Sequence, residues 1–358
     1  MSNKNKFRNF KFVDKVKRYR GIFPTRLNKI RLDANERVSE FDNKFLTGLI
    51  KKIQSHHFTA YPEVEEIYDL LAKFNKIKRE NIMITAGSDI GIRHCFELFA
   101  EPKSQIITLS PTFGMYDVYS KLFNVNQLKI GYDKDLELNY TKLINSINKN
   151  TSLILLANPN SPTGTIISED NILKLLKKAK TYKSFVVIDE AYFGFYKHSS
   201  IKYLKTFNNL IVLRTFSKAI GMAGIRTGYI ISSSQNIKRL YSFRPMYEIS
   251  SVSCLAIKEI LKNYKLVKKY INETNKGKEF LVNQLSKIKL KSFKTYSNFI
   301  LVNFNTKNKC LKVFKNLNKN GILTRKAPNI KACENSLRFT LGPKKYMQIL
   351  IKEIKKSL

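Results

Sequence analysis

The most informative part of this chain reads Thr215-Phe-Ser-Lys218-Ala-Ile-Gly221-Met-Ala-Gly224-Ile-Arg226-Thr-Gly228, and it directly follows an apolar run that ends at Arg214. Glycines spaced this closely disfavour a helix, so we interpret the segment as a loop whose backbone closely approaches another group. Lys218 stands beside hydroxyl side chains, and Arg226 follows within the same loop. An amine nucleophile next to an anion-binding group is what a phosphorylated aldehyde cofactor requires. Most lysines of a basic chain are solvated surface residues, but the neighbouring residues of Lys218 indicate that it is not one of them.

Three other segments have the composition of ligand-binding turns. The run Phe185–Asp189 places a carboxylate at the carboxyl end of an apolar strand, where open α/β sheets bind ligands. The segment Asn158–Gly164 combines Asn, Pro and Gly in a tight turn that presents amide and hydroxyl groups. The segment Thr85–Asp89 opens a helix, whose free N–H groups favour a phosphate. Each segment could by itself be an ordinary turn or helix cap, but together they favour one binding site.

Apolar strand-like runs alternate with helical patterns from about residue 63 to 244, which predicts an α/β domain with a mainly parallel sheet. The expected strands are Asn81–Thr85, Gln105–Leu109, Ser152–Ala157, Phe185–Ile188, Leu210–Arg214 and Gly228–Ile231. After Pro245 long helical stretches precede a few short strands, which predicts a smaller α+β domain. We therefore expect an N-terminal segment over 1–40 that packs on the small domain, a large domain over 41–245 and a small domain over 246–358.

The chain is strongly basic, with 65 lysine and arginine residues against 27 acidic ones and a net charge of +38. Clustered lysines would indicate a nucleic acid or an anionic membrane surface as partner. Lysine is instead abundant from end to end, so we interpret the charge as a solvated surface and expect no specific nucleic acid. No apolar stretch reaches the length of a signal peptide or a membrane span, so we expect no membrane partner.

The cysteines Cys95, Cys254, Cys310 and Cys333 lie far apart in the sequence, and no two have the spacing of a zinc site. The sequence therefore predicts neither a disulfide framework nor a metal site. We expect a cytoplasmic protein in a reducing environment.

Together with several other motifs, these segments resemble the fold-type-I pyridoxal-phosphate aminotransferases, and most closely their histidinol-phosphate aminotransferase branch. The resemblance covers nearly the whole chain and implies pyridoxal 5′-phosphate (PLP) as cofactor, the fold of a type-I PLP-dependent transferase, and a homodimer with shared active sites. The motifs that carry it are Leu32-Asp-Ala-Asn35-Glu36, Tyr61-Pro62, Gly87-Ser-Asp89, Pro111-Thr-Phe113-Gly-Met-Tyr116, the Asn158–Gly164 turn, Asp189-Glu-Ala-Tyr192, the Lys218 segment and Leu337-Arg338-Phe-Thr-Leu-Gly342.

The resemblance also implies roles for individual residues. Lys218 would bind the cofactor covalently and move the substrate proton, Asp189 would pair with the ring nitrogen, and Tyr192 would hydrogen-bond the ring hydroxyl. Tyr61 would reach the phosphate of the cofactor in the neighbouring subunit. The remaining cofactor-binding residues that the resemblance implies are Gly87, Ser88, Asp89, Phe113, Asn160, Thr215, Ser217 and Arg226.

Substrate recognition is implied mainly for the C-terminal region. Arg338 resembles the arginine that grips the anionic end of the substrate, and Arg325 matches a second arginine of the branch. Asn35, from the N-terminal motif, completes the implied substrate site. Two guanidinium groups suit a doubly charged phosphate-type group. The alternative is that both arginines are surface salt-bridge partners.

The sequence departs from the branch at three positions. Ser161 stands where the branch has the ring-binding Asn of the turn, so Asn160 or a water would have to replace that contact. Arg37 and Arg244 place cations where relatives are uncharged. These extra arginines either select a more acidic substrate or reflect the basic composition.

We therefore expect an aminotransferase that moves an amino group between a donor, glutamate, and a small anionic oxo-substrate that carries a phosphate. A PLP-dependent decarboxylase of the threonine-phosphate type shares nearly every motif and stays open as an alternative. A catalytically silent or nucleic-acid-binding member of the fold is the rival from another class. The presence of Lys218, Asp189, Tyr192 and Arg226 argues against that rival.

Overall fold

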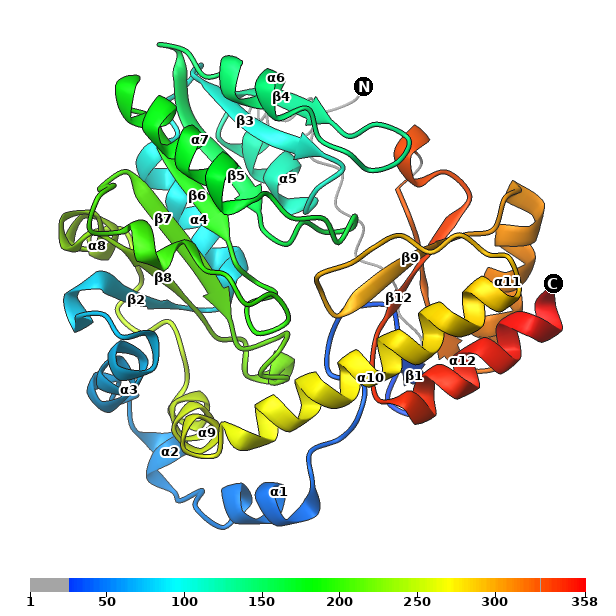
Figure 1. Ribbon diagram of the computed structural model, residues 1–358. Coiled ribbons are helices and arrows are strands. Elements are labelled where there is room, and N and C mark those ends of the chain that lie inside the picture. Colours follow the sequence, from blue (N-terminus) through cyan, green and yellow to red (C-terminus); the bar gives the residue numbers. More distant parts are fainter. Residues whose placement is uncertain (1–25, 329) are drawn as a thin grey trace, which may run out of the picture.

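The computed structural model describes residues 26–328 and 330–358. A large α/β lobe contains the central sheet, and a smaller lobe contains the C-terminus (Figure 1). Among the described residues, no helix is both long enough and apolar enough to cross a membrane.

The large domain is built on one sheet. Within the described residues its spatial order is β2 (Ile82–Thr85), β8 (Gly228–Ser232), β7 (Leu210–Thr215), β6 (Phe185–Asp189), β5 (Thr151–Ala157), β3 (Gln105–Ser110) and β4 (Asn126–Gly131). β8 pairs antiparallel with β2 and β7, and the other neighbours are parallel, so the predicted mainly parallel sheet is confirmed. The sequence did not predict β4, because this edge strand has mostly exposed or half-buried side chains and therefore lacks an apolar run.

Helices cover both faces of this sheet (Figure 1). They are α3 (Glu65–Asn75), α4 (Ser88–Phe99), α5 (Met115–Leu122), α7 (Glu169–Thr181), α8 (Ser234–Tyr241) and α9 (Ser251–Lys262). On one face α4, α5 and α8 form a core in which Phe96 and Leu240 pack with Leu213 of β7. On the other face α3, α7 and α9 form a core in which Leu176 packs with Val212. Both faces of β7 are thus buried, which explains its continuous apolar sequence.

Shorter elements connect these layers. They are α1 (Asn43–Ile50), α2 (His56–Thr59), α6 (Tyr140–Asn145) and the 3-10 turns η1 (Arg79–Asn81), η2 (Ser200–Tyr203), η3 (Ala223–Ile225) and η4 (Lys331–Cys333).

In the described part of the chain, the small domain packs three helices against a short antiparallel sheet. Its elements are α10 (Lys265–Lys287), β9 (Phe299–Asn303), α11 (Lys307–Lys319), β10 (Ile322–Leu323), β11 (Arg325–Lys326), β12 (Ser336–Thr340) and α12 (Lys344–Ser357). The sheet has the order β11-β12-β9, and its core includes Val313 and Leu350. From the N-terminal segment, β1 (Ile30–Arg31) pairs parallel with β10, and Leu32 joins the same core. Residues 1–25 of the expected N-terminal segment lie outside the described residues.

The two hydrophobic cores place the domain boundary later than the expected 245/246. The apolar side of α9, including Ile257, packs into the core of the large domain, and so does Val267 at the start of α10. Leu281, further along α10, belongs to the core of the small domain. We therefore place the boundary inside α10. The expected boundary at 245/246 rested on the change of pattern after Pro245, and a helix can follow a turn and still pack on the preceding domain.

Candidate active site

A cavity of about 720 Å³ lies at the carboxyl ends of β5, β6 and β7, between the two domains. Open α/β sheets bind ligands at this edge. The predicted site residues that line the cavity are Asn35, Ser88, Asp89, Phe113, Asp189, Tyr192, Thr215, Ser217, Lys218, Arg226, Arg325 and Arg338. Most of the implied cofactor residues and all the implied substrate residues therefore meet in one place.

The amine of Lys218 is held in this cavity by the N-terminal segment. Its Nζ donates a hydrogen bond to the backbone carbonyl of Ala34 at 3.0 Å. Burial, together with the positive charges of Arg338 and Arg226, lowers the pKa of Lys218 to about 8, although Glu36 opposes the shift. A substantial fraction of the amine is therefore neutral, and nucleophilic, just above neutral pH.

The carboxylate of Asp189 lies at the end of β6 and is only 4% exposed. Tyr116 Oη donates a hydrogen bond to Oδ2 at 3.2 Å, and the backbone N–H of Ala191 donates to Oδ1 at 3.0 Å. Burial raises the pKa of Asp189 to about 6, because these neutral donors only partly replace the lost hydration. A cationic ring nitrogen bound here would favour the ionised form and bring this pKa down.

Three glycines lie at tight approaches around the Lys218 loop and the start of α4. Gly87 has a φ of +88°, and a Cβ on it would lie 2.9 Å from Nη2 of Arg226. A Cβ on Gly228 would lie 2.5 Å from the backbone nitrogen of Ser88. Gly221 has a φ of +85° and packs against the side chain of Arg37. These glycines confirm the interpretation of a loop in close contact with its surroundings, although a Cβ on Gly224 would meet nothing within 4 Å.

An anion-binding corner results at the N-terminus of α4. Arg226 Nη1 donates a hydrogen bond to Ser217 Oγ at 3.3 Å, and Thr215 Oγ1 donates to the same hydroxyl at 3.1 Å. Ser88 opens the helix behind Gly87, so helix N–H groups add to the guanidinium. A phosphate corner, a buried amine and a buried carboxylate in one cavity fit a phosphorylated pyridine aldehyde such as PLP.

The hydroxyl of Tyr192 connects the N-terminal motif with the Asn158–Gly164 turn. Asn35 Nδ2 donates a hydrogen bond to Tyr192 Oη at 2.9 Å, across 157 positions of sequence. Burial raises the pKa of Tyr192, while Arg338 and hydrogen bonds from Ser161 and Asn35 oppose the rise. Ser161, rather than its predecessor in the turn, faces this hydroxyl.

Asn160 does not line the cavity, in contrast to the sequence prediction. Its Nδ2 donates to the carbonyl of Pro111 and to Thr163 Oγ1, both at 2.9 Å. Its Oδ1 accepts a hydrogen bond from Thr112 at 2.7 Å. The amide is thus occupied in shaping the turn, and Ser161 is the polar turn residue left to face a ligand.

The arginines Arg325 and Arg338 lie side by side on neighbouring strands, as partners in the β11–β12 register. Arg338 Nη2 donates to the carbonyl of Asp33 at 2.6 Å, and its Nε is buried without a partner. Burial lowers the pKa of Arg338 to about 10, and its attraction to Tyr192 only partly offsets this, while Arg325 adds to the lowering. Among the described residues neither arginine has an ion pair, which argues against the surface salt-bridge alternative.

Two predicted cofactor residues occupy more exposed positions. Phe113 lies at the cavity wall and is 38% exposed. Tyr61 is 75% exposed, lies outside the cavity, and stacks on Tyr247 with ring centroids 4.2 Å apart. Tyr61 therefore contributes nothing to the cavity of its own chain.

The extra arginines lie away from the cavity lining. The guanidinium of Arg37 is sandwiched between the rings of Phe41 and Tyr270, at 4.3 and 4.0 Å. Arg244 donates to the carbonyls of Pro245 and Met246. Neither residue lines the cavity, so the structure gives no support to the hypothesis that they select a more acidic substrate.

The sequence interpretation missed Tyr116, Ala34, and the pair Glu190 and Arg214 behind the cavity. Tyr116 stands at the end of one of the family motifs, but its helical spacing is that of an ordinary core residue. The carbonyl of Ala34 has no sequence signal at all. Glu190 and Arg214 each adjoin a predicted site residue, which was the available signal.

Comparisons with known proteins identify the family. Residues 28–354 match the family model described as aminotransferase class I and II. This chain belongs to that aminotransferase family. The histidinol-phosphate aminotransferase of Caldanaerobacter subterraneus subsp. tengcongensis is 32% identical over 334 residues, which cover 92% of this chain and 93% of that protein.

Solved structures share the fold of this aminotransferase. The histidinol-phosphate aminotransferase from Sinorhizobium meliloti in complex with pyridoxal-5′-phosphate has a TM-score of 0.86 at 19% identity, and the match covers 99% of this chain and 100% of that one. The L-threonine-O-3-phosphate decarboxylase from Porphyromonas gingivalis has a TM-score of 0.75 at 20% identity, with 91% and 98% covered. The protein is thus a PLP-dependent aminotransferase of fold type I that uses amino-acid and oxo-acid substrates, which confirms the predicted fold, enzyme class and cofactor.

Proposed function

We propose that this enzyme transfers an amino group between glutamate and a small oxo-substrate that carries a phosphate. The observation that carries the proposal is one cavity that contains the buried amine of Lys218, the buried carboxylate of Asp189 and the paired arginines Arg325 and Arg338. The names of the relatives support histidinol phosphate as the phosphorylated amine.

For the cofactor, we propose that Asp189 faces the ring nitrogen and that Phe113 stacks on the ring. Tyr192 and Ser161 would hydrogen-bond the ring hydroxyl, which gives Ser161 the place that the sequence left open. The phosphate would be held by the corner of Gly87, Ser88, Asp89, Thr215, Ser217 and Arg226. Once bound, PLP supplies a conjugated ring that takes up electrons from the substrate carbon next to the amine.

Lys218 is the residue proposed to move the substrate proton. A general base works best when its pKa lies near the working pH, and burial brings the pKa of Lys218 to about 8. Its Nζ can therefore accept a proton from the substrate carbon and release it again. The carbonyl of Ala34, which accepts a hydrogen bond from Nζ at 3.0 Å, orients the amine.

Arg325 and Arg338 are proposed to bind the anionic end of the substrate. Each charge-assisted hydrogen bond contributes roughly 1.5–3 kcal/mol, and a phosphate offers acceptors for both guanidinium groups. The substitution Arg325→Ala should therefore lower kcat/KM for a phosphorylated amine at least about tenfold, with a smaller effect on a plain amino acid of similar shape. An unchanged ratio of the two kcat/KM values would favour a general amino-acid aminotransferase.

The reaction type is tested directly with two assays of the purified holoenzyme. We expect histidinol phosphate and 2-oxoglutarate to yield glutamate. We expect no release of carbon dioxide from threonine phosphate. Carbon dioxide release without amino transfer would replace the proposal with the decarboxylase.

We propose a homodimer in which Tyr61 reaches the cofactor phosphate of the second copy. The exposed position of Tyr61 next to Tyr247, with Met246 76% and Phe58 73% exposed nearby in sequence, supports an apolar contact surface. Mixing and refolding two variants, Lys218→Ala and Tyr61→Ala, tests the arrangement. If the sites are shared, half of the dimers are hybrid and each has one native site, so about a quarter of the native activity should return. No gain over the separate variants would contradict shared sites.

We also propose a reducing, cytoplasmic setting for the enzyme. All four cysteines are buried free thiols, and burial raises the pKa of Cys254 and of Cys333 to about 11. Such thiols are poorly reactive and do not depend on oxidation for their structure.

A further inference from the structure

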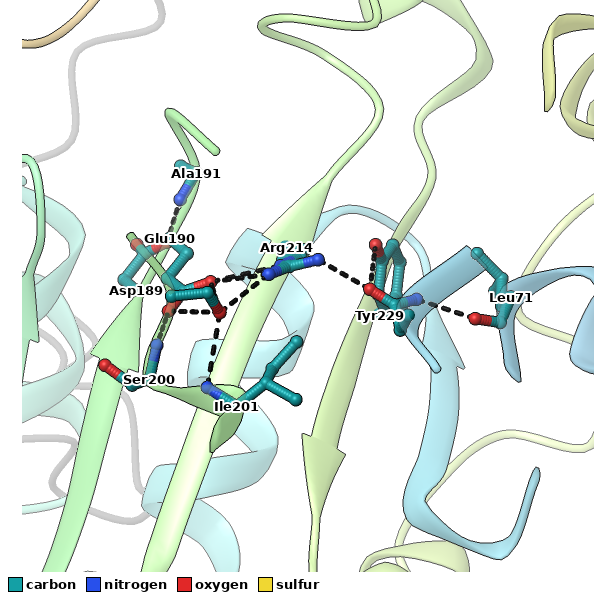
Figure 2. Close-up of polar contacts among 10 residues, drawn as sticks. Leu71, Asp189, Glu190, Ala191, Ser200, Ile201, Arg214 and Tyr229 are labelled. Carbon is teal, nitrogen blue, oxygen red and sulfur yellow. Dashed lines mark hydrogen bonds and ion pairs between the residues drawn. The ribbon is translucent and has the colours of Figure 1, made fainter. Parts of the chain in front are cut away.

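A second charged cluster, drawn in Figure 2, lies at the same strand ends but outside the lining of the cavity. Glu190 follows Asp189 at the end of β6, and Arg214 precedes Thr215 at the end of β7. Successive side chains of a strand point to opposite faces. Asp189 and Thr215 therefore line the cavity, whereas Glu190 and Arg214 do not. The two clusters share the same pair of strand ends.

Arg214 and Glu190 form a buried ion pair in which each residue is 3% exposed. Arg214 Nε and Nη2 donate to Glu190 Oε2 at 3.1 and 2.9 Å. Ser199 Oγ donates to the same carboxylate oxygen at 2.8 Å and accepts from Arg214 Nη2 at 2.8 Å. The backbone N–H of Ser200 donates to Oε1 at 2.6 Å. Both carboxylate oxygens are thus satisfied.

The other end of the guanidinium is fixed to α3. Arg214 Nη1 donates to Asn75 Oδ1 at 2.5 Å, and Asn75 in turn donates to the carbonyl of Leu71 at 2.7 Å. Tyr229 of β8 donates to the same Asn75 oxygen at 3.4 Å. The ring of Phe193 lies 3.3 Å from the guanidinium carbon. Figure 2 shows the resulting row of side chains, which runs from Glu190 through Arg214 to Tyr229.

The main effect of such a network is to fix the relative positions of the groups that it joins, rather than to raise the free energy of unfolding. The desolvation of two buried charges offsets most of their attraction, so a buried pair adds little to stability over apolar side chains of similar size. Hydrogen bonds with fixed angles nevertheless hold strand ends against sliding, which apolar contacts do not do. The network joins the ends of β6 and β7 to α3, to β8 and to the start of η2. Asp189 and the Thr215–Lys218 segment lie at these same strand ends.

We infer that Glu190 and Arg214 are positioning residues, which fix Asp189 and the Thr215–Lys218 segment at the separation that the cofactor requires. The inference rests on the proposed function for the roles of Asp189 and Lys218. A small displacement of reacting groups, on the order of 1 Å, lowers a rate by about 10²-fold even when its origin lies far from the chemistry.

The test compares two variants of the same strand pair. Glu190→Gln removes the negative charge of the network and leaves the charge of Arg214 without its partner, but it keeps the shape of the side chain. Asn209→Ala is the matched control, because Asn209 Nδ2 donates to the carbonyl of Ser184 at 2.8 Å and so links the opposite ends of the same strands. For both variants the melting temperature of the cofactor-free protein, the PLP dissociation constant, kcat, KM and the visible circular dichroism per bound PLP are measured.

We expect Glu190→Gln to raise the PLP dissociation constant at least about tenfold and to lower kcat by about 10²-fold, with KM within about twofold. The circular dichroism per bound PLP should change, because it reports the orientation of the ring. Asn209→Ala should lower the melting temperature and leave the other quantities near those of the wild type. Equal losses in the two variants would overturn the positioning role.

A second variant covers the case in which Glu190→Gln does not fold. Arg214→Lys keeps the charge but cannot contact Glu190, Ser199 and Asn75 together, so it should reproduce the changes in dissociation constant and kcat. If it binds PLP with an unchanged dissociation constant and circular dichroism, the inference is wrong. Failure of the proposed function has a different signature, since Lys218→Ala or Asp189→Asn would then keep near-wild-type activity, whatever Glu190→Gln does.

Discussion

Asp189 and Glu190 are neighbours in the chain, but the two faces of the sheet place their charges in opposite situations. On the cavity side, burial raises the pKa of Asp189 to about 6 and lowers that of Lys218 to about 8. On the far side, burial lowers the pKa of Arg214, but the charge of Glu190 more than compensates, so this pKa lies above its ordinary value. Burial without a charged partner weakens ionisation, whereas burial with a partner preserves it.

This difference separates the residues proposed to take part in the reaction, Asp189 and Lys218, from the residues inferred to position them, Glu190 and Arg214. On the cavity side, the protein keeps groups whose charge a ligand can change, at a cost to its own stability. Behind the sheet, charges are matched within the protein and need no ligand. Substitutions on the two sides should therefore change activity and stability in different combinations.

The largest expected effect is the loss of activity on substitution of Lys218, which lies on the cavity side of the sheet. Lys218→Ala removes the amine that binds the cofactor and moves the proton, so activity should fall by more than about 10³-fold and the visible absorbance of bound PLP should disappear. The fold should persist, as judged by the melting temperature of the cofactor-free protein. Lys177→Ala, at an exposed position of α7, is the control and should resemble the wild type. Full activity of Lys218→Ala would show that this amine takes no part in the reaction.

Asp189→Asn should change activity and stability in opposite directions. A neutral amide cannot support a cationic ring nitrogen, so kcat should fall at least about tenfold, a barrier increase of ~1.4 kcal/mol. The pKa of Asp189 is about 6 in the folded protein and 3.8 as its ordinary value, so its burial costs stability as pH rises from about 4 to above 6. At pH 8 the cofactor-free variant should therefore be more stable than the wild type, by on the order of 3 kcal/mol.

Chemical denaturation of both cofactor-free proteins at pH 4 and pH 8 measures this difference, which should shrink toward pH 4. A variant that is less stable than the wild type at pH 8 would show that Asp189 is held as firmly as Glu190. The comparison between the two faces would then fail.

A smaller effect concerns the pH at which the cofactor-free protein captures PLP. Only the neutral amine of Lys218 reacts, so the capture rate should rise with pH around a midpoint of about 8. Arg338→Gln removes a positive charge that lowers this pKa and should move the midpoint upward. The absorbance change after rapid mixing measures the rate. A midpoint near the ordinary value of 10.5 would mean that burial does not tune the amine.

The smallest effect is expected for the stability of the fold when His94 is replaced. His94 lies in α4, which packs on the cavity side of the sheet, and it is paired with carboxylates. The ring nitrogens of His94 lie 2.8 Å from Glu97 Oε2 and 2.7 Å from Glu248 Oε1. Burial lowers the pKa of His94, but the two carboxylates raise it more, so it lies above its ordinary 6.5. The protonated ring thus stabilises the fold below pH 6.5, and this stabilisation is lost as pH rises through the raised pKa.

His94→Gln should accordingly lower the melting temperature more at pH 6 than at pH 9, with kcat unchanged. A difference that grows with pH would contradict the assigned charge. Such a result would also show that a charge can be paired with carboxylates and still behave like the unpaired groups of the cavity.

Patterns of local sequence predicted the strand ends that carry the site. Lys218, Asp189 and Arg226 stand in short segments whose composition is typical of ligand-binding loops and strand ends, and the structure brings them into one cavity. The parallel strands were equally visible, since burial on both faces demands an apolar run. The edge strand β4 was not predicted, because most of its side chains are exposed or half-buried and it therefore needs no apolar run.

Choices between adjacent residues could not be made from the sequence. Asn160 and Ser161 both suit a polar turn, and only the packing of Thr112 and Pro111 against the amide turns Asn160 inward. The contact between Asn35 and Tyr192 likewise depends on how the N-terminal segment crosses the molecule. Such long-range contacts follow from the assembled fold and leave no periodic signal.

The placement of the domain boundary inside α10 restricts how the length of this chain can change. The helix has 23 residues and joins the core around Val267 to the core around Leu281 without a loop between them (Figure 1). At a rise of 1.5 Å per residue, the helix is about 34 Å long. One inserted residue between the two anchors would rotate the small domain by about 100° relative to the sheet. Arg325 and Arg338 would then swing away from Lys218, so insertions and deletions in this stretch should be excluded in functional descendants of this chain, whereas surface loops remain free to vary in length.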